Sequence, residues 1–185
     1  MKKIALITFH HPESTLPLVK YLAKKGNTVD YYYIAAYRFK CDAAFDFGGK
    51  VDRLGIMDLS KKRIPDMYNY MESDRVKIHI IGLLPGNLEY FGYYFRNVLF
   101  IFQINKIILK LAGKKIRKKN YDTINIVGQE KLLKTLHKSI KHKNKFHTFH
   151  EISDHLTGDI KHKELLNYIF KNKIKIIVHS QNTFD

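Results

Sequence analysis

Residues 3–34 read KIALITFHHPESTLPLVKYLAKKGNTVDYYYI, and this stretch decides the fold class. The apolar run 3–9 has the composition of a buried strand. Apolar residues then recur at helical spacing up to about residue 25, and the run 28–34 is again rich in strand-forming residues. The sequence therefore predicts a strand, a crossing helix and a second strand parallel to the first.

The ends of this predicted helix follow from its flanking residues. Ser14 or Thr15 is expected to cap its amino-terminal end, because a side-chain oxygen there accepts the free amide hydrogens of the first turn. Gly26 is expected to end the helix, because glycine takes the left-handed turn without a Cβ clash. The loop between the strand and the helix would then run from His10 to Ser14.

The same alternation continues along the chain. Strands are predicted at 76–81, 121–127, 146–150 and 174–179, and helices at 65–70, 88–118 (where Gly113 could break the helix), 130–141 and 162–172. Between them, residues 39–49 are expected to be a loop and residues 51–54 a short strand. This alternation predicts an α/β, three-layer Rossmann-like domain: a mostly parallel sheet with helices on both faces, formed by residues 1–185 as a single unit.

The composition indicates a folded and strongly basic protein. Hydrophobic residues make up 45% of the 185 residues, which excludes a disordered chain. The net charge is +16, so we expect an anionic partner: nucleic acid, an acidic membrane surface or a phosphorylated ligand. Cys41 is the single cysteine, which excludes an internal disulfide and favours a reducing compartment. The first apolar run is too short for a signal peptide, and no uncharged run is long enough to span a bilayer, so we expect a cytoplasmic protein.

Polar residues follow the ends of several predicted strands. Ligands bind outside the carboxyl ends of an open parallel sheet, so these residues are expected to form one binding edge. The set comprises His10, His11, Glu13, Ser14, Gln129, His150, Glu151 and Ser180. The helix that follows the first loop could hold an anion at its amino-terminal end, and His150 could contact a sugar hydroxyl or transfer a proton. The alternatives are a cap with solvated histidines in the loop, and a His150 bonded to a backbone carbonyl.

Common cofactor and catalytic motifs are absent from the sequence. No GxGxxG follows the first strand, and Gly48-Gly49-Lys50 lacks the upstream glycine of a P-loop. Ser180 does not stand in a GxSxG turn. The residues His150, Glu151, Asp154 and His155 do not have the spacing of a zinc site, so no metal is expected.

Aromatic and basic residues of the long predicted helix suggest a surface role. Tyrosines and basic residues could meet a membrane interface, namely Tyr90, Tyr93, Tyr94, Lys114, Lys115, Arg117 and Lys118. Residues 106–185 carry 18 basic and 7 acidic side chains, which is +11 of the total charge. The same charge could bind nucleic acid, although no nucleic-acid-binding motif is present. A packed core helix and a solvated basic face are the structural alternatives.

Three stretches, in this order, resemble family 4-type glycosyltransferases of the GT-B fold. The stretch TFHHPESTLPLVKYLAKKGNTVDYYYI is similar to their first strand, H-x-P-x-S loop, helix and second strand. The stretch FHTFHEI resembles their strand that ends in His-Glu, and IKIIVHSQNTFD resembles their strand that ends in Ser and leads toward a second lobe.

The resemblance implies a specific role for the chain. It would be the N-terminal, acceptor-binding lobe of a retaining hexosyltransferase in polysaccharide synthesis, inactive without a C-terminal lobe that holds the nucleotide-sugar donor. His150 would lie beside the donor sugar, and Glu151 near a glycan or lipid-linked acceptor. The loop from His10 to Ser14 would face the donor phosphates or the acceptor. The resemblance implies no cofactor and no metal, with the enzyme at the inner face of the membrane. A nucleic-acid-binding module and a non-catalytic membrane-surface module remain the alternatives.

Overall fold

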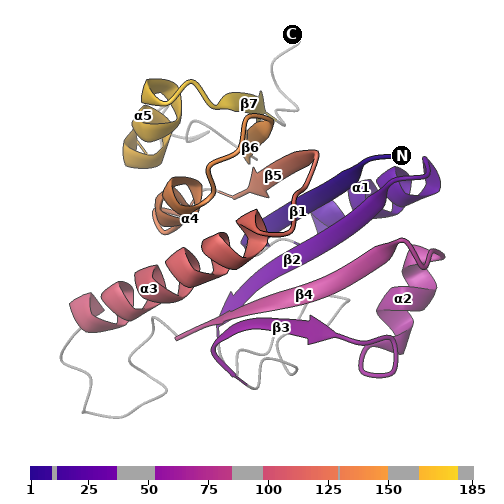
Figure 1. Ribbon diagram of the computed structural model, residues 1–185. Coiled ribbons are helices and arrows are strands. Elements are labelled where there is room, and N and C mark those ends of the chain that lie inside the picture. Colours follow the sequence, from indigo (N-terminus) through magenta and orange to yellow (C-terminus); the bar gives the residue numbers. More distant parts are fainter. Residues whose placement is uncertain (10–11, 37–52, 85–97, 129, 150–162, 179–185) are drawn as a thin grey trace, which may run out of the picture.

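A computed structural model describes residues 1–9, 12–36, 53–84, 98–128, 130–149 and 163–178, without the side chains of residues 12–14, 36 and 98–100 (Figure 1). The described strands are β1 (Lys3–Phe9), β2 (Thr28–Ala36), β3 (Gly55–Leu59), β4 (Val76–Leu83), β5 (Thr123–Val127), β6 (Lys145–Phe149) and β7 (Lys175–Val178). The described helices are α1 (Pro12–Lys24), α2 (Pro65–Met71), α3 (Val98–Arg117), α4 (Leu133–Ser139) and α5 (Lys163–Lys171).

The strands form one sheet in the order β3-β4-β2-β1-β5-β6-β7. Every neighbouring pair is parallel except β3 with β4, which is antiparallel. From β1 the chain moves outward to β2 and β4, and α3 then leads it back to β5 on the other side of β1. The strand order therefore reverses between β1 and β5, as in doubly wound α/β folds.

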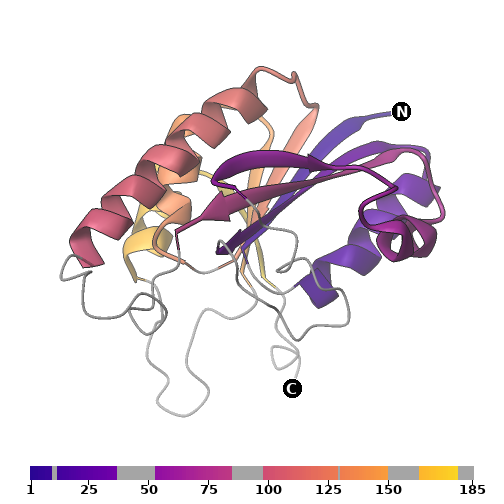
Figure 2. The same ribbon diagram turned by 90° about the horizontal axis from the view of Figure 1, so that it is seen from below.

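Helices cover both faces of the sheet, which confirms the predicted three-layer α/β class (Figure 2). On β2, Tyr31 and Tyr33 pack with α1 and α2 on one face, whereas Tyr32 and Ile34 pack with α3, α4 and α5 on the other. This alternation follows from the two-residue period of a strand. Both faces of the central strands are thus removed from water.

Helix α3 runs through Gly113 without a break. A Cβ atom built at Gly113 would lie 1.8 Å from Ser139 Oγ and 2.8 Å from Ser139 Cβ, both on α4. The glycine is therefore the residue that lets α3 and α4 pack closely. It has this packing role in place of the helix break suggested by the sequence.

Two local predictions were wrong. Helix α1 begins at Pro12, because proline is preorganised for the first turn of a helix, so Ser14 and Thr15 lie inside the helix and do not cap it. The side chain of Thr15 is buried, and its hydroxyl lies 3.0 Å from the hydroxyl of Tyr31. Of the strand expected at 51–54, residues 51 and 52 lie outside the described residues and 53 and 54 are not in a strand; the described strand is Gly55–Leu59, where alternate apolar side chains can reach the core.

Candidate functional site

The carboxyl ends of β1, β5, β6 and β7 share one edge of the sheet. These four strands are neighbours in the sheet and run parallel. They end at Phe9, Val127, Phe149 and Val178. Each end is followed within three residues by members of the polar set predicted from the sequence. The reversal of strand order between β1 and β5 makes this edge the expected position of a ligand crevice.

Most of the predicted site residues lie outside the described residues. This applies to the side chains of His10, His11, Glu13, Ser14, Gln129, His150, Glu151 and Ser180, although the backbone of Glu13 and Ser14 belongs to α1. It also applies to Tyr90, Tyr93 and Tyr94. Among the described residues, no group of three or more His, Cys, Asp or Glu side chains could hold a metal ion. The roles predicted for these residues stay predictions.

Gly128 fixes the backbone where β5 ends at this edge. Its φ of +137° lies in a region that favours glycine, and an added Cβ would lie 2.7 Å from a carboxylate oxygen of Glu130. The amide of Gly128 donates a hydrogen bond to the carbonyl of Thr148 at the end of β6. The carboxyl ends of β5 and β6 are therefore tied together one residue before the predicted Gln129.

A pair of buried histidines connects Gly128 to α4. His147 Nε2 donates to the Gly128 carbonyl at 3.0 Å, because a carbonyl oxygen can only accept. In a neutral ring, His147 Nδ1 is then an acceptor, and His137 Nε2 donates to it at 2.8 Å. His137 Nδ1 is left as a buried acceptor that has no hydrogen-bond partner among the described residues. The contacts thus assign one tautomer to each ring.

Burial keeps both of these histidines neutral. Burial lowers the pKa of His147 to about 4. The hydrogen bond to the Gly128 carbonyl would raise this pKa, but its effect is weaker than that of burial. Burial, followed by the nearby His147 and Lys145, holds the pKa of His137 well below its ordinary value. A neutral pair with fixed tautomers positions backbone atoms of the edge rather than exchanging protons at physiological pH.

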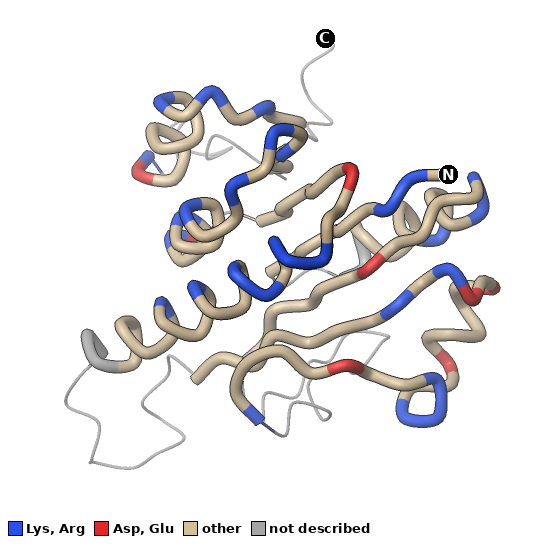
Figure 3. The backbone as a smooth tube through the Cα atoms, viewed as in Figure 1, with Lys and Arg blue, Asp and Glu red and all other residues tan. Residues whose placement is uncertain are grey.

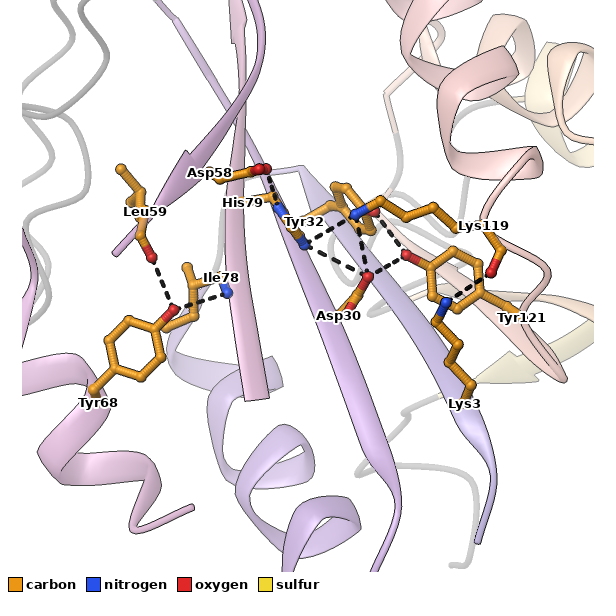
Figure 4. Close-up of polar contacts among 10 residues, drawn as sticks. All are labelled: Lys3, Asp30, Tyr32, Asp58, Leu59, Tyr68, Ile78, His79, Lys119 and Tyr121. Carbon is orange, nitrogen blue, oxygen red and sulfur yellow. Dashed lines mark hydrogen bonds and ion pairs between the residues drawn. The ribbon is translucent and has the colours of Figure 1, made fainter. Parts of the chain in front are cut away.

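A second polar cluster lies on the same face of the sheet as α3 (Figure 4). Asp30 of β2 accepts hydrogen bonds from the hydroxyl of Tyr121 and from Lys119 Nζ at 3.3 Å. Its Oδ2 also lies 3.6 Å from His79 Nε2, and His79 Nδ1 lies 2.6 Å from Asp58 Oδ1 on β3. The cluster therefore links β2, β3, β4 and the segment between α3 and β5.

The charges in this cluster stabilise one another. Burial alone would raise the pKa of Asp30, but its interactions with His79, Tyr121 and Lys119 outweigh burial and hold that pKa well below its ordinary range. Burial and the neighbouring Asp30 raise the pKa of Tyr121, so its hydroxyl stays protonated and donates. The cluster holds a permanent carboxylate in the interior.

This cluster is separate from the carboxyl edge. In the register of the sheet, Asp30 pairs with Ala5, four residues before the end of β1, which corresponds to about 13 Å along the strand. The side chains of Asp30 and His79 are each only 4% exposed. Because they offer a substrate almost no surface, the cluster is best described as a structural connection between strands.

The basic residues predicted for a membrane surface are exposed where the structure describes them. Lys114, Lys115 and Arg117 lie in the last turn of α3, and Lys118 follows directly. Figure 3 shows further basic residues near the ends of α4 and α5. Among the described helices, none combines the length and apolar character that a membrane crossing requires. Among the residues that the structure describes, positive charge is thus concentrated at the amino-terminal edge of the sheet, opposite the carboxyl edge.

Comparison with known proteins gives distant structural neighbours. No family model and no curated protein matches the chain. The C-terminal domain of a hydrogenase from Pyrococcus furiosus is 12% identical over 96% of this chain and 90% of that one, with a TM-score of 0.41. A trehalose-6-phosphate protein of E. coli with bound UDP-2-fluoro glucose is 10% identical over 90% of this chain and 38% of that one, with a TM-score of 0.45. At these TM-scores, the likeness to the two proteins does not indicate a function for this chain.

Sequence reasoning missed both buried polar clusters. A signal was present for the Asp30 cluster: Asp30 lies within the strand-forming run TVDYYYI, and His79 lies between isoleucines in VKIHII, where the strand period places it on the side opposite to Ile78 and Ile80. A charged residue inside such a strand needs partners, because an unpaired buried charge is very costly. For the histidine pair the sequence carried no such signal, since His137 and His147 lie on separate elements and only the fold brings them together.

Proposed function

We propose that this chain is the N-terminal, acceptor-binding lobe of a retaining glycosyltransferase that acts in cell-surface polysaccharide synthesis. One observation carries the proposal. The three stretches that resemble the GT-B family contain β1 with α1, β6 and β7, and these strands end at one sheet edge, with β5 between β1 and β6. The family's polar motifs follow those strand ends in the same order, so the fold and the motifs agree.

The proposal gives each part of the edge a task. His150 acts beside the donor sugar as the catalytic residue, and Glu151 binds near the acceptor. The loop from His10 to Ser14 contacts donor phosphate or acceptor, and Gln129 and Ser180 complete the polar rim. The nucleotide-sugar is a substrate held mainly by a second lobe, and the lobe described here needs no resident cofactor or metal. The exposed basic residues around Lys114 and Lys118 lie at the opposite edge, so they suit attachment to an anionic membrane with the carboxyl edge turned toward a glycan acceptor in solution.

The test is nucleotide release by a full-length polypeptide that contains this chain, measured with a panel of UDP-, GDP- and ADP-sugars in the presence of membrane lipid extract. His150→Ala is expected to lower turnover by about 100-fold or more while leaving the melting temperature unchanged. Lys61→Gln, which removes an exposed charge far from the carboxyl edge, serves as the control and should keep wild-type turnover.

Two results would contradict the proposal at different levels. Wild-type turnover by the His150→Ala variant would exclude the catalytic role of that residue while leaving the fold assignment intact. Absence of nucleotide release with every donor, together with tight and salt-dependent binding of single-stranded or duplex nucleic acid, would replace the glycosyltransferase with a nucleic-acid-binding module.

A further inference from the structure

A basic pocket lies at the edge of the sheet opposite the proposed acceptor site. It has a volume of about 330 Å³ and lies between the end of α4, the start of β6 and the end of α5. Five lysines line it: Lys138, Lys141, Lys143, Lys145 and Lys173. His137 and His142 also line it, and no Asp or Glu does.

None of these five lysines has an acidic partner among the described residues, whereas a few lysines elsewhere do. Lys20 and Lys24 pair with Glu72, and Lys131 pairs with Glu164 at 2.8 Å. No described carboxylate forms an ion pair with any of the five pocket lysines. Their positive charge is therefore uncompensated by any described acidic side chain, in a concave site where field lines are concentrated.

One of the five is held in place by the backbone. Lys145 Nζ donates to the carbonyl oxygens of His137 and Ile140, both at 2.8 Å, at the carboxyl-terminal end of α4. An ammonium group has three donors, so one N–H of Lys145 remains beyond these two bonds. Burial lowers the pKa of Lys145 to about 8, because the charged ammonium group loses water there and has no described carboxylate beside it.

We propose that this pocket binds an anion that carries two or more phosphate groups. A single phosphate carries at most about two negative charges, so five lysines are matched better by a multiply phosphorylated group. The volume exceeds that of one phosphate, and the lining residues Tyr168, Ile140 and Ile174 can contact the carbon skeleton that joins the phosphates. The site is separate from the carboxyl edge, and the proposal stands whether or not the chain is a glycosyltransferase lobe.

The first experiment uses pyrophosphate as the probe and isothermal titration calorimetry with the 185-residue chain. The double variant Lys141→Gln/Lys143→Gln is expected to weaken binding by about tenfold or more, because each charged hydrogen bond contributes substantially. The matched control is Lys61→Gln/Lys62→Gln, which removes the same charge from two exposed lysines between β3 and α2. The control is expected to bind within about twofold of the wild type once salt screens long-range attraction.

A second experiment distinguishes a free phosphate compound from a lipid headgroup. The same three proteins are sedimented with phosphatidylcholine vesicles that contain either phosphatidylinositol bisphosphate or phosphatidylserine at equal surface charge. Binding that prefers the bisphosphate lipid and is lost only in the Lys141→Gln/Lys143→Gln variant assigns the pocket to a headgroup. Pyrophosphate binding without that preference assigns it to a free anion. The proposal is overturned if the wild type binds neither probe, or if both double variants lose binding equally.

Discussion

Asp30 is the residue whose surroundings most clearly decide the stability of the fold. It is a buried carboxylate whose partners come from β4 and from the segment between α3 and β5. Asp30→Asn is expected to lower the free energy of unfolding by about 3 kcal/mol, because Lys119 and His79 would lose their charged partner. Urea denaturation followed by circular dichroism measures this difference.

Asp58→Asn is the matched control for that prediction. Asp58 contacts the same His79, but its side chain is 80% exposed, so its loss should cost less than about 1 kcal/mol. Equal losses in the two variants would show that burial of the carboxylate does not set the strength of the cluster.

The histidine pair predicts a pH dependence of stability. The pKa of His147 falls from its ordinary 6.5 to about 4 on folding, so the unfolded chain binds more protons between these values. Stability is therefore fully present above about pH 6.5 and decreases as the pH falls through about 4, by up to about 3 kcal/mol. The groups that face His147 include His137 and the Gly128 carbonyl, and Lys145 lies close to His137.

The His147→Gln variant isolates this contribution. Glutamine can still donate to the Gly128 carbonyl, but it does not titrate. Between pH 7 and pH 4.5, the free energy of unfolding of the His147→Gln variant is expected to fall less than that of the wild type. Parallel losses in the two proteins would mean that carboxylates alone cause the acid sensitivity.

At the scale of elements, Gly113 allows α3 and α4 to approach closely, because it has no Cβ atom. Gly113→Ala is expected to destabilise the fold by about 2 kcal/mol, because the added Cβ overlaps Ser139 and forces the helices apart. The double variant Gly113→Ala/Ser139→Gly should recover part of this loss, which a double-mutant cycle by thermal or urea unfolding measures. Strictly additive losses would show that the two positions are not in contact.

Most elements could be predicted from the sequence, because the spacing of apolar residues and the positions of glycines depend only on neighbouring residues in the chain. The run before Phe9 and the run 76–81 both carry the continuous apolar character of a buried strand, and both strands were found there. The start of α1 and the position of β3 could not be predicted in the same way. Pro12 begins the helix earlier than the Ser14 signal suggested, and β3 is placed by its pairing with β4, which is a long-range contact.

At the scale of the whole molecule, the order of the strands could not be predicted from the spacing of residues within each strand. Alternating strands and helices predicted parallel pairing, but they did not predict that β3 would join β4 antiparallel at the edge. The polar residues that follow the strand ends were proposed as a site from their position in the chain, and their grouping stays a prediction. The unpaired lysines of the pocket were not, because they come from segments around Lys141 and Lys173 that only the packing of α4 and α5 brings together.

The sheet order also predicts a gradient of local stability. Strand β1 is central and its core residues are fully buried, whereas Ile177 and Val178 of β7 are 41% and 43% exposed. Amides of β1 are expected to exchange with deuterium about 100-fold more slowly than those of β7, measured by mass spectrometry or NMR. Equal rates would mean that the sheet opens only as one cooperative unit.

The collection of lysines at the amino-terminal edge has a mechanical consequence. Among the described residues, the ends of α3, α4 and α5 give this edge an excess of positive charge, so the folded chain has an electric dipole along its strands. A negatively charged body exerts a torque on such a dipole and rotates the approaching molecule until the lysines lead. The carboxyl ends of the strands then trail, pointing back to the open solvent, where soluble compounds can still reach them.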